Sequence, residues 1–146
     1  MAQWLSPLRG ASVGARPETR MSVKPLISIV DDDESVRETT MDLVNSMGFA
    51  AQAFPRAADF LKSGDLSHTS CLIADMRMPG MTGLELHSHL AKSGHTIPTI
   101  LITAFPDDRD RARARQSGVR YYLAKPFQDK ELLDCIRRAI GSAEAN

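Results

Sequence analysis

The sequence predicts an α/β fold, a doubly wound five-stranded parallel sheet with helices on both faces. From Pro25 onward, five short apolar runs alternate with helical patterns at a spacing of about 20 residues, which is typical of consecutive βα units. Several of these runs are apolar almost throughout, as expected for strands that are buried on both faces. The chain has 146 residues and no internal repeat, which suits one domain of ordinary size.

The first βα unit starts with the run Leu26–Val30, which contains a single serine and predicts a buried strand. A helix is predicted over Glu34–Met47, because apolar side chains recur there at helical spacing and Gly48 follows at the position that often ends a helix. The second unit is shorter, with a strand predicted over Phe49–Phe54 and a helix over Ala57–Lys62.

The third strand is predicted over Cys71–Ala74 and ends on Asp75. The segment MRMPGMTG follows, and its proline and glycines indicate a loop. We expect Gly83 to serve the turn into the next helix, which is predicted over Leu84–Lys92.

The fourth strand is the apolar run Ile97–Ile102, and the fifth is Tyr121–Ala124. The helix predicted between them, Asp107–Ser117, is weaker because it contains few apolar residues. The last helix is predicted over Asp129–Ile140, where leucine and isoleucine side chains share one face.

Residues 1–24 are predicted to be a disordered N-terminal extension, residues 25–142 a single domain and residues 143–146 a short tail. The extension mixes Gly, Pro, Ser and Arg without periodicity and lacks the apolar segment of a secretory signal, and Met21 offers a second start of translation. No apolar stretch is long enough to span a membrane. The formal net charge of zero gives no support for nonspecific binding of nucleic acid.

The two cysteines, Cys71 and Cys135, lie in apolar patterns and do not form a C-x-x-C pair. We therefore expect two reduced thiols in the core of a cytoplasmic protein, and neither a disulfide nor a metal site.

Polar groups stand where the predicted strands end. They are Asp31, Asp32 and Asp33 after the first strand, Asp75 after the third, Thr103 after the fourth and Lys125 after the fifth. The carboxyl ends of parallel strands meet at one edge of the sheet, where ligands of open α/β folds bind. Clustered carboxylates suit Mg²⁺, which prefers oxygen ligands, and an ammonium group suits a phosphoryl oxygen. No cysteine or histidine converges there, so a zinc site is not expected.

These groups lie in four segments that resemble the receiver domain of two-component response regulators, the CheY-like family, with motifs most similar to its FixJ-like subgroup. The resemblance covers roughly residues 26–140. Its segments occur in the family's order and with similar spacing: IVDDDESVR, LIADMRMPGMTGLEL, TILITAF and YYLAKPF. It implies a flavodoxin-like sheet with the strand order 2-1-3-4-5.

The resemblance implies a role for each acidic residue and for the lysine. Asp75 matches the phosphoacceptor, and Asp31 and Asp32 match the acidic pair that holds Mg²⁺ together with Asp75 and the backbone carbonyl of Arg77. Lys125 matches the lysine that pairs with Asp75 and then with the phosphoryl group.

Two further positions match the family's switch. Thr103 matches the hydroxyl that binds the phosphoryl group, and Tyr122 matches the aromatic side chain that turns in response. The family pattern also implies a cis peptide bond between Lys125 and Pro126. A fixed core aromatic is the alternative for Tyr122, and a strand-end hydroxyl without a switching role is the alternative for Thr103. Asp33 is expected to cap the helix that follows it rather than to bind metal.

The implied function is that of a stand-alone response regulator, because no residues remain for an output domain. It would receive a phosphoryl group from a histidine kinase or a histidine phosphotransfer protein, and it would bind a downstream protein through its fourth helix, fifth strand and fifth helix. A homodimer that forms on phosphorylation is a further expectation, whereas direct contact with nucleic acid or membrane is not expected. The protein would assist its own phosphorylation and dephosphorylation without being an enzyme in the usual sense.

Two alternatives stay open at this point. The chain could be the receiver portion of a truncated DNA-binding transcriptional regulator, whose motifs it most resembles. It could also be a phosphatase of the haloacid dehalogenase type, which uses Asp, Mg²⁺ and Lys. That class carries a second aspartate two residues after the nucleophile, where this chain has Arg77, and it usually carries a cap insertion that is absent here.

The predicted fourth helix departs from the family in its charge. Arg111 and Arg115 stand where the family often has Ala or Leu, so this helix is expected to be loosely packed and to present a basic face. We therefore expect an acidic surface on the partner that binds it.

Overall fold

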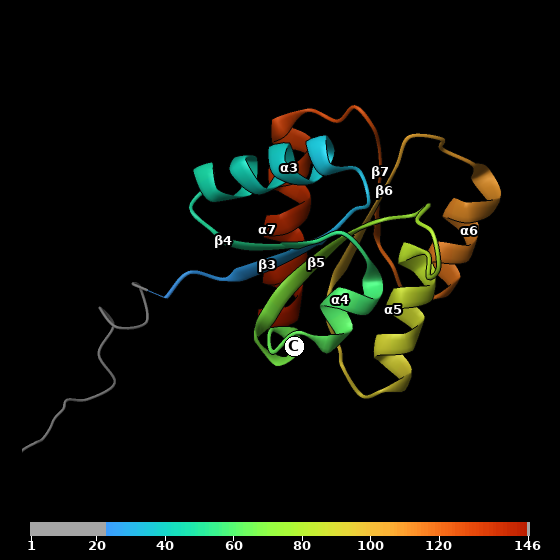
Figure 1. Ribbon diagram of the computed structural model, residues 1–146, viewed down its shortest axis with the longest axis horizontal. Helices are drawn as coiled ribbons and strands as arrows, with labels where there is room; N and C mark the ends of the chain where they lie inside the picture. The colour runs from blue at the N-terminus through green and yellow to red at the C-terminus, as the bar shows by residue number, and fades with distance from the viewer. Residues whose placement is uncertain (1–22, 146) are drawn as a thin grey trace, which may run out of the picture.

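The structure is a computed structural model that describes residues 23–145, and in this range five helices flank one five-stranded sheet (Figure 1). All neighbouring strands are parallel, and their order is β4-β3-β5-β6-β7. Numbered along the chain, this is the order 2-1-3-4-5, so the predicted fold class and topology are confirmed.

The strands and helices alternate along the chain. The elements are β3 (Leu26–Val30), α3 (Glu34–Ser46), β4 (Ala50–Phe54), α4 (Ala57–Lys62), the 3₁₀ turn η1 (Leu66–His68), β5 (Thr69–Asp75), α5 (Gly83–Lys92), β6 (Thr99–Thr103), α6 (Asp108–Gln116), β7 (Tyr121–Ala124) and α7 (Asp129–Ala145). The predicted extension, residues 1–24, lies outside the described residues except for positions 23 and 24. In the described part of the chain, no helix is long and apolar enough to cross a membrane.

Element types agree with the prediction, whereas several boundaries differ. β6 begins at Thr99 rather than Ile97, because Pro98 lacks an amide hydrogen for the sheet ladder. β5 begins at Thr69, two residues earlier than predicted, where it pairs with Leu26 of β3, and the Thr69 hydroxyl also forms a hydrogen bond of 2.7 Å with the Ser28 hydroxyl. α7 continues to Ala145 because the alanines and the glutamate after Ile140 favour helix.

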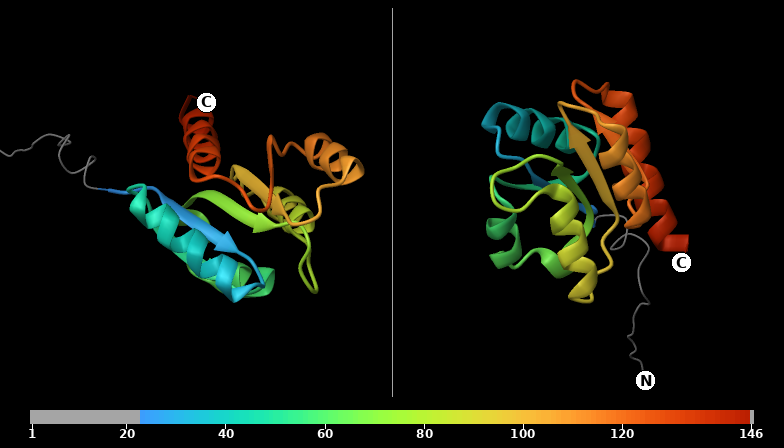
Figure 2. Two further views of the ribbon diagram at one scale, coloured as in Figure 1. Left: turned by 90° about the horizontal axis from the view of Figure 1, so that it is seen from above. Right: turned by 90° about the vertical axis from the view of Figure 1, so that its right-hand side faces the viewer.

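The helices cover both faces of the sheet, as the two further views show (Figure 2). On one face, β-strand side chains pack against α4, α5 and α6 through residues such as Phe60, Leu86 and Ala114. On the other face, they pack against α3 and α7 through residues such as Val44 and Ile136. Because alternate side chains of the central strands enter both clusters, these strands are apolar throughout, as the sequence pattern indicated.

Gly83 has a different role from the expected one. It is the first residue of α5, and a β-carbon there would lie 2.5 Å from the carbonyl oxygen of Asp75 and 2.9 Å from Cδ2 of Leu101. Its φ angle is not in the left-handed region, so the turn itself does not require glycine. Gly83 instead allows α5 to pack directly against the end of β5, next to the Asp75 backbone.

We predict that Gly83→Ala lowers the free energy of unfolding by about 1–3 kcal/mol, because the added methyl group meets backbone that cannot easily move. Urea unfolding measures this change. Gly64→Ala is the matched control, since a β-carbon at Gly64 meets nothing within 4 Å, and its effect should stay within about 0.5 kcal/mol. Equal effects of the two substitutions would contradict the close approach.

Candidate functional site

The carboxyl edge of the sheet brings the predicted acidic residues together. Asp31 directly follows β3, Asp75 is the last residue of β5, and Asp32 lies beside Asp31. One carboxylate oxygen from each of the three lies within 4.8 Å of the others. Asp31 is fully buried and Asp75 is 6% exposed, whereas Asp32 is open to solvent.

Lys125 enters the same cluster from the end of β7. Its Nζ donates hydrogen bonds to Oδ2 of Asp31 and to Oδ2 of Asp75, each at 3.0 Å. Its amide donates to the carbonyl oxygen of Thr103 at 2.8 Å, and the peptide bond to Pro126 is cis, as the resemblance implied. The lysine is therefore held at the backbone and at its ammonium group.

Local hydrogen bonds fix the loop that carries Asp31. The amide of Asp33 donates to Oδ1 of Asp31 at 2.9 Å, and Nη1 of Arg37 donates to the carbonyl oxygen of Asp31 at 2.7 Å. Asp33 also accepts a hydrogen bond from the amide of Val36 at 3.1 Å, so its predicted capping of α3 is confirmed. Arg37 is not among the site residues predicted from the sequence, although a basic residue one turn into the helix after three aspartates is a signal for such a contact.

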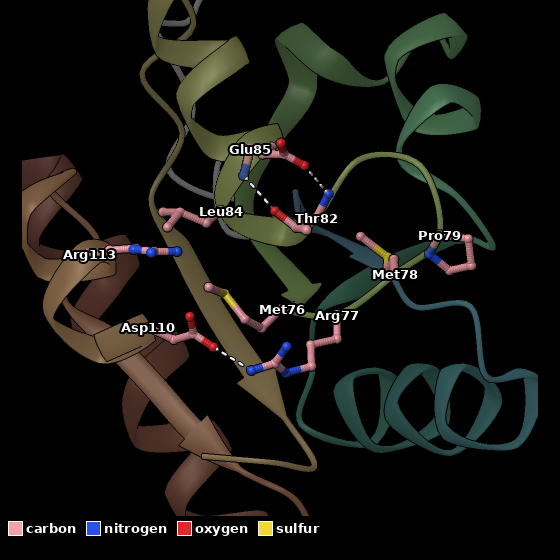
Figure 3. Close-up of a pocket in the computed structure, with 9 residues that line it drawn as sticks. All are labelled: Met76, Arg77, Met78, Pro79, Thr82, Leu84, Glu85, Asp110 and Arg113. Carbon is pink, nitrogen blue, oxygen red and sulfur yellow. Dashed lines mark hydrogen bonds and ion pairs between the residues drawn. The ribbon is translucent and has the colours of Figure 1, made fainter. Parts of the chain in front are cut away.

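Arg77 contacts the site through its backbone and a different element through its side chain. Its amide donates to Oδ1 of Asp75 at 3.0 Å. Its guanidinium pairs with Asp110 of α6 at 2.8 Å (Figure 3). Sequence reasoning did not identify Asp110, because nothing in the local pattern separates it from the other charged residues of α6.

The two predicted switch residues make no hydrogen bond with the three carboxylates within residues 23–145. Thr103 is buried at the end of β6, and its Oγ1 accepts a hydrogen bond from the amide of Phe105 at 3.1 Å. The Tyr122 ring is half-buried, and the guanidinium carbon of Arg111 lies 5.1 Å from the ring centroid. The Tyr122 hydroxyl is buried without a hydrogen-bond partner among the described residues. A switching role for either residue stays a prediction.

Burial and hydrogen bonds shift the pKa values of two groups in this cluster. Burial raises the pKa of Asp31 above its ordinary value of 3.8, although hydrogen bonds from the Asp33 amide and from Lys125 oppose the rise. Burial lowers the pKa of Lys125, but its hydrogen bonds with Asp75 and Asp31 outweigh that effect and raise the pKa above 10.5. The lysine is therefore charged at neutral pH, and Asp31 is a carboxylate whose ionisation is unfavourable without further positive charge.

The donor set fits a hard divalent cation. All three grouped side chains are carboxylates, and Mg²⁺ prefers oxygen ligands. A cation would also stabilise the ionised form of the buried Asp31. The cysteines are not among the grouped ligands: Cys71 is buried in the core with its pKa raised to about 12, and Cys135 is a half-buried free thiol.

Comparison with known families decides what kind of domain carries this site. The family model described as the response regulator receiver domain matches residues 27–137. The chain belongs to this family. Receiver domains are signalling domains of two-component systems that bind Mg²⁺ at an acidic pocket, and membership therefore decides against the phosphatase alternative.

Individual relatives agree with this membership. The chain is 38% identical over 123 residues to nodulation protein W of Bradyrhizobium diazoefficiens, covering 84% of this chain and 54% of that protein. It is 35% identical over 119 residues to the transcriptional regulatory protein FixJ of Azorhizobium caulinodans, covering 81% of this chain and 56% of that protein. The chain thus spans about half the length of the curated relatives it matches.

Solved receiver structures share the architecture. The response regulator StyR superposes with a TM-score of 0.77 at 40% identity, covering 84% of this chain and 63% of that one. The FixJ N-terminal domain superposes with a TM-score of 0.73 at 32% identity, covering 80% of this chain and 94% of that one. The chemotaxis protein CheY4 of Vibrio cholerae, at 21% identity and a TM-score of 0.74 over 80% of this chain and 99% of that one, shows the common fold.

We predict that the ionised form of Asp31 lowers the stability of the receiver domain in a metal chelator. Its folded-state pKa lies above its unfolded value, so the unfolded state loses the proton first as the pH rises. Asp31→Asn should therefore gain stability relative to wild type as the pH rises above 3.8, the ordinary pKa of an aspartate. Urea unfolding at each pH measures this, with Asp32→Asn at the exposed neighbour as the control. A difference that is the same at every pH would contradict the prediction.

Proposed function

We propose that Asp75 of this receiver domain accepts a phosphoryl group from a histidine kinase or a histidine phosphotransfer protein. The observation that carries the proposal is the Lys125 ammonium group, which bonds to Asp31 and Asp75 at 3.0 Å each within a largely buried cluster of three carboxylates. Asp31, Asp32, Asp75 and the carbonyl of Arg77 would hold Mg²⁺, which when bound neutralises charge on the phosphoryl oxygens.

In this reaction a carboxylate oxygen of Asp75 forms a bond to phosphorus while the phosphorus–nitrogen bond of phosphohistidine breaks. The electron pair of that bond returns to the imidazole nitrogen, and the product is an acyl phosphate on Asp75. Because phosphoryl transfer depends mainly on positioning and charge neutralisation, the domain assists the step without a separate catalytic base. Lys125 would neutralise phosphoryl oxygens, and the hydrogen bonds of Asp75 with Lys125 and with the Arg77 amide hold the carboxylate in place.

The phosphoryl group would then change the surface formed by α6, β7 and α7. We propose that the Thr103 hydroxyl exchanges its contact with the Phe105 amide for one with a phosphoryl oxygen, and that Tyr122 turns toward the space it leaves. The Tyr122 hydroxyl is not fixed by a hydrogen bond within residues 23–145, which supports such a movement. A local change of charge would in this way select between two arrangements of one surface.

The domain would act as a response regulator on a downstream protein partner, and it could form a homodimer on phosphorylation. The two unpaired thiols support a cytoplasmic location, where cysteines stay reduced. The alternative is that the chain is the receiver portion of a longer DNA-binding regulator. A reading frame that continues with about 60 helical residues after Asn146, the usual size of a small DNA-binding domain, would favour this alternative.

We predict that incubation with Mg²⁺ and a small acyl phosphate adds one base-labile phosphoryl group to the wild-type domain, as measured by intact mass. Asp75→Ala should gain none, and chelation of Mg²⁺ should prevent the modification of wild type. Asp42→Ala, at an exposed acid of α3, is the control and should be modified like wild type. Equal modification of wild type and Asp75→Ala would remove the central step of the proposal.

We predict that the basic side of α6 binds an acidic partner surface. Arg111 and Arg115 are exposed, and α6 buries only Asp110 and Ala114. A synthetic peptide rich in Asp and Glu should bind wild type, and reversal of both arginines to Glu should weaken binding by about tenfold in fluorescence titration at low salt. Arg56→Glu, at the exposed residue that precedes α4, is the control, and unchanged affinity after the double reversal would contradict the prediction.

A further inference from the structure

One residue links the predicted phosphoacceptor to α6. The backbone amide of Arg77 donates to Oδ1 of Asp75 at 3.0 Å, which keeps Arg77 beside the carboxylate. Its side chain reaches α6, where Nη2 donates to Oδ2 of Asp110 at 2.8 Å (Figure 3). A change at Asp75 therefore acts on a residue that already contacts α6.

Asp110 depends on this contact. It lies on the inner face of α6, where its side chain is 12% exposed, and its one ion pair within residues 23–145 is with Arg77. The first turn of a helix favours a carboxylate, but that effect is weak compared with a direct charge partner at a side chain that is only 12% exposed. Without Arg77, Asp110 has no charge partner within residues 23–145, and a movement of α6 would increase its contact with water in the neighbouring cavity.

The other side of α6 contacts the predicted switch aromatic. Arg111 follows Asp110 in the chain, and its guanidinium carbon lies 5.1 Å from the centroid of the Tyr122 ring. A movement of α6 therefore changes the surroundings of Tyr122 directly. This connection from Asp75 to Tyr122 runs through Arg77 and α6 and does not involve Thr103.

We propose that the Arg77–Asp110 ion pair holds α6 in its unphosphorylated position, and that phosphorylation of Asp75 draws the Arg77 guanidinium away from Asp110. The inference rests on the proposed phosphorylation. A phosphoryl group replaces one negative charge by about two and adds acceptor oxygens that a guanidinium binds in bidentate geometry. α6 then moves until Asp110 is hydrated, and the contact between Arg111 and Tyr122 changes with it.

The space around the ion pair permits this exchange. Arg77 and Asp110 line a cavity of about 530 Å³ between α6 and the loop after β5, together with Met78, Leu84 and Arg113 (Figure 3). The Arg77 side chain is 54% exposed, so its guanidinium can turn without displacing packed side chains.

Hydrogen exchange of the α6 amides, followed by mass spectrometry, tests the proposal. In wild type, phosphorylation with Mg²⁺ and acyl phosphate should raise α6 exchange by about tenfold. Asp110→Asn keeps the shape and removes the charge, so it should show this rise before phosphorylation and change less than twofold after it. Arg77→Gln should show the same early rise, and the double variant should exceed neither single variant, because all three remove the same interaction.

Arg113→Gln is the matched control, since Arg113 lines the same cavity but makes no ion pair within the described part of the chain. It should behave like wild type. Exchange of the buried β5 amides should stay low in every variant, which separates release of α6 from general unfolding. If Asp110→Asn also raises the exchange of the β5 amides, the α6 exchange of Arg77→Gln compared with that of Arg113→Gln decides whether the ion pair holds α6.

The proposal is wrong if α6 exchanges at the wild-type rate in both single variants, or if phosphorylation raises α6 exchange equally in wild type and Asp110→Asn. Intact mass shows whether wild type gains a phosphoryl group, and this separates failure of the ion-pair proposal from failure of the proposed function. A wild type that gains no phosphoryl group overturns the function, whereas the unphosphorylated variants still decide whether the ion pair holds α6.

Discussion

The carboxyl edge of the sheet holds two largely buried carboxylates, Asp31 and Asp75, around one ammonium group, Lys125. Their oxygens lie within 4.8 Å of each other, so the two carboxylates repel, and burial removes water from them. The arrangement therefore requires positive charge between them. Because Lys125 bonds to both, it connects the ends of β3, β5 and β7. A cation or a phosphoryl group added here alters the charge that three strand ends share.

The parallel topology makes this cluster. The strand order β4-β3-β5-β6-β7 places β3 beside β5, and β6 between β5 and β7, so their carboxyl ends face a common edge. Two contacts with the covering helices then hold the backbone of this edge. Gly83 lets α5 approach the Asp75 carbonyl, and Arg37 of α3 donates a hydrogen bond to the Asp31 carbonyl at 2.7 Å. The elements that cover the sheet thus hold the backbone of the site, whereas its charged side chains contact one another at the carboxyl edge.

The side of the domain that carries α6 is built differently. α6 buries only Asp110 and Ala114, and one of these is charged. An element with so few apolar contacts depends more on single polar interactions than α7 does, whose leucine and isoleucine side chains enter the core. The proposed response of the α6 surface to phosphorylation relies on this contrast between a fixed site and a weakly packed neighbouring helix.

The sequence by itself determined the fold class, the types of the elements and the chemistry at the strand ends, because hydrophobic periodicity and residue type are local properties. It also indicated the capping of α3 by Asp33, which involves neighbours in the chain. The tertiary structure decided that Gly83 serves close packing rather than a turn, and that Arg77 pairs with Asp110, 33 residues away. No local pattern encodes such contacts, since they exist only after the crossovers bring distant segments side by side.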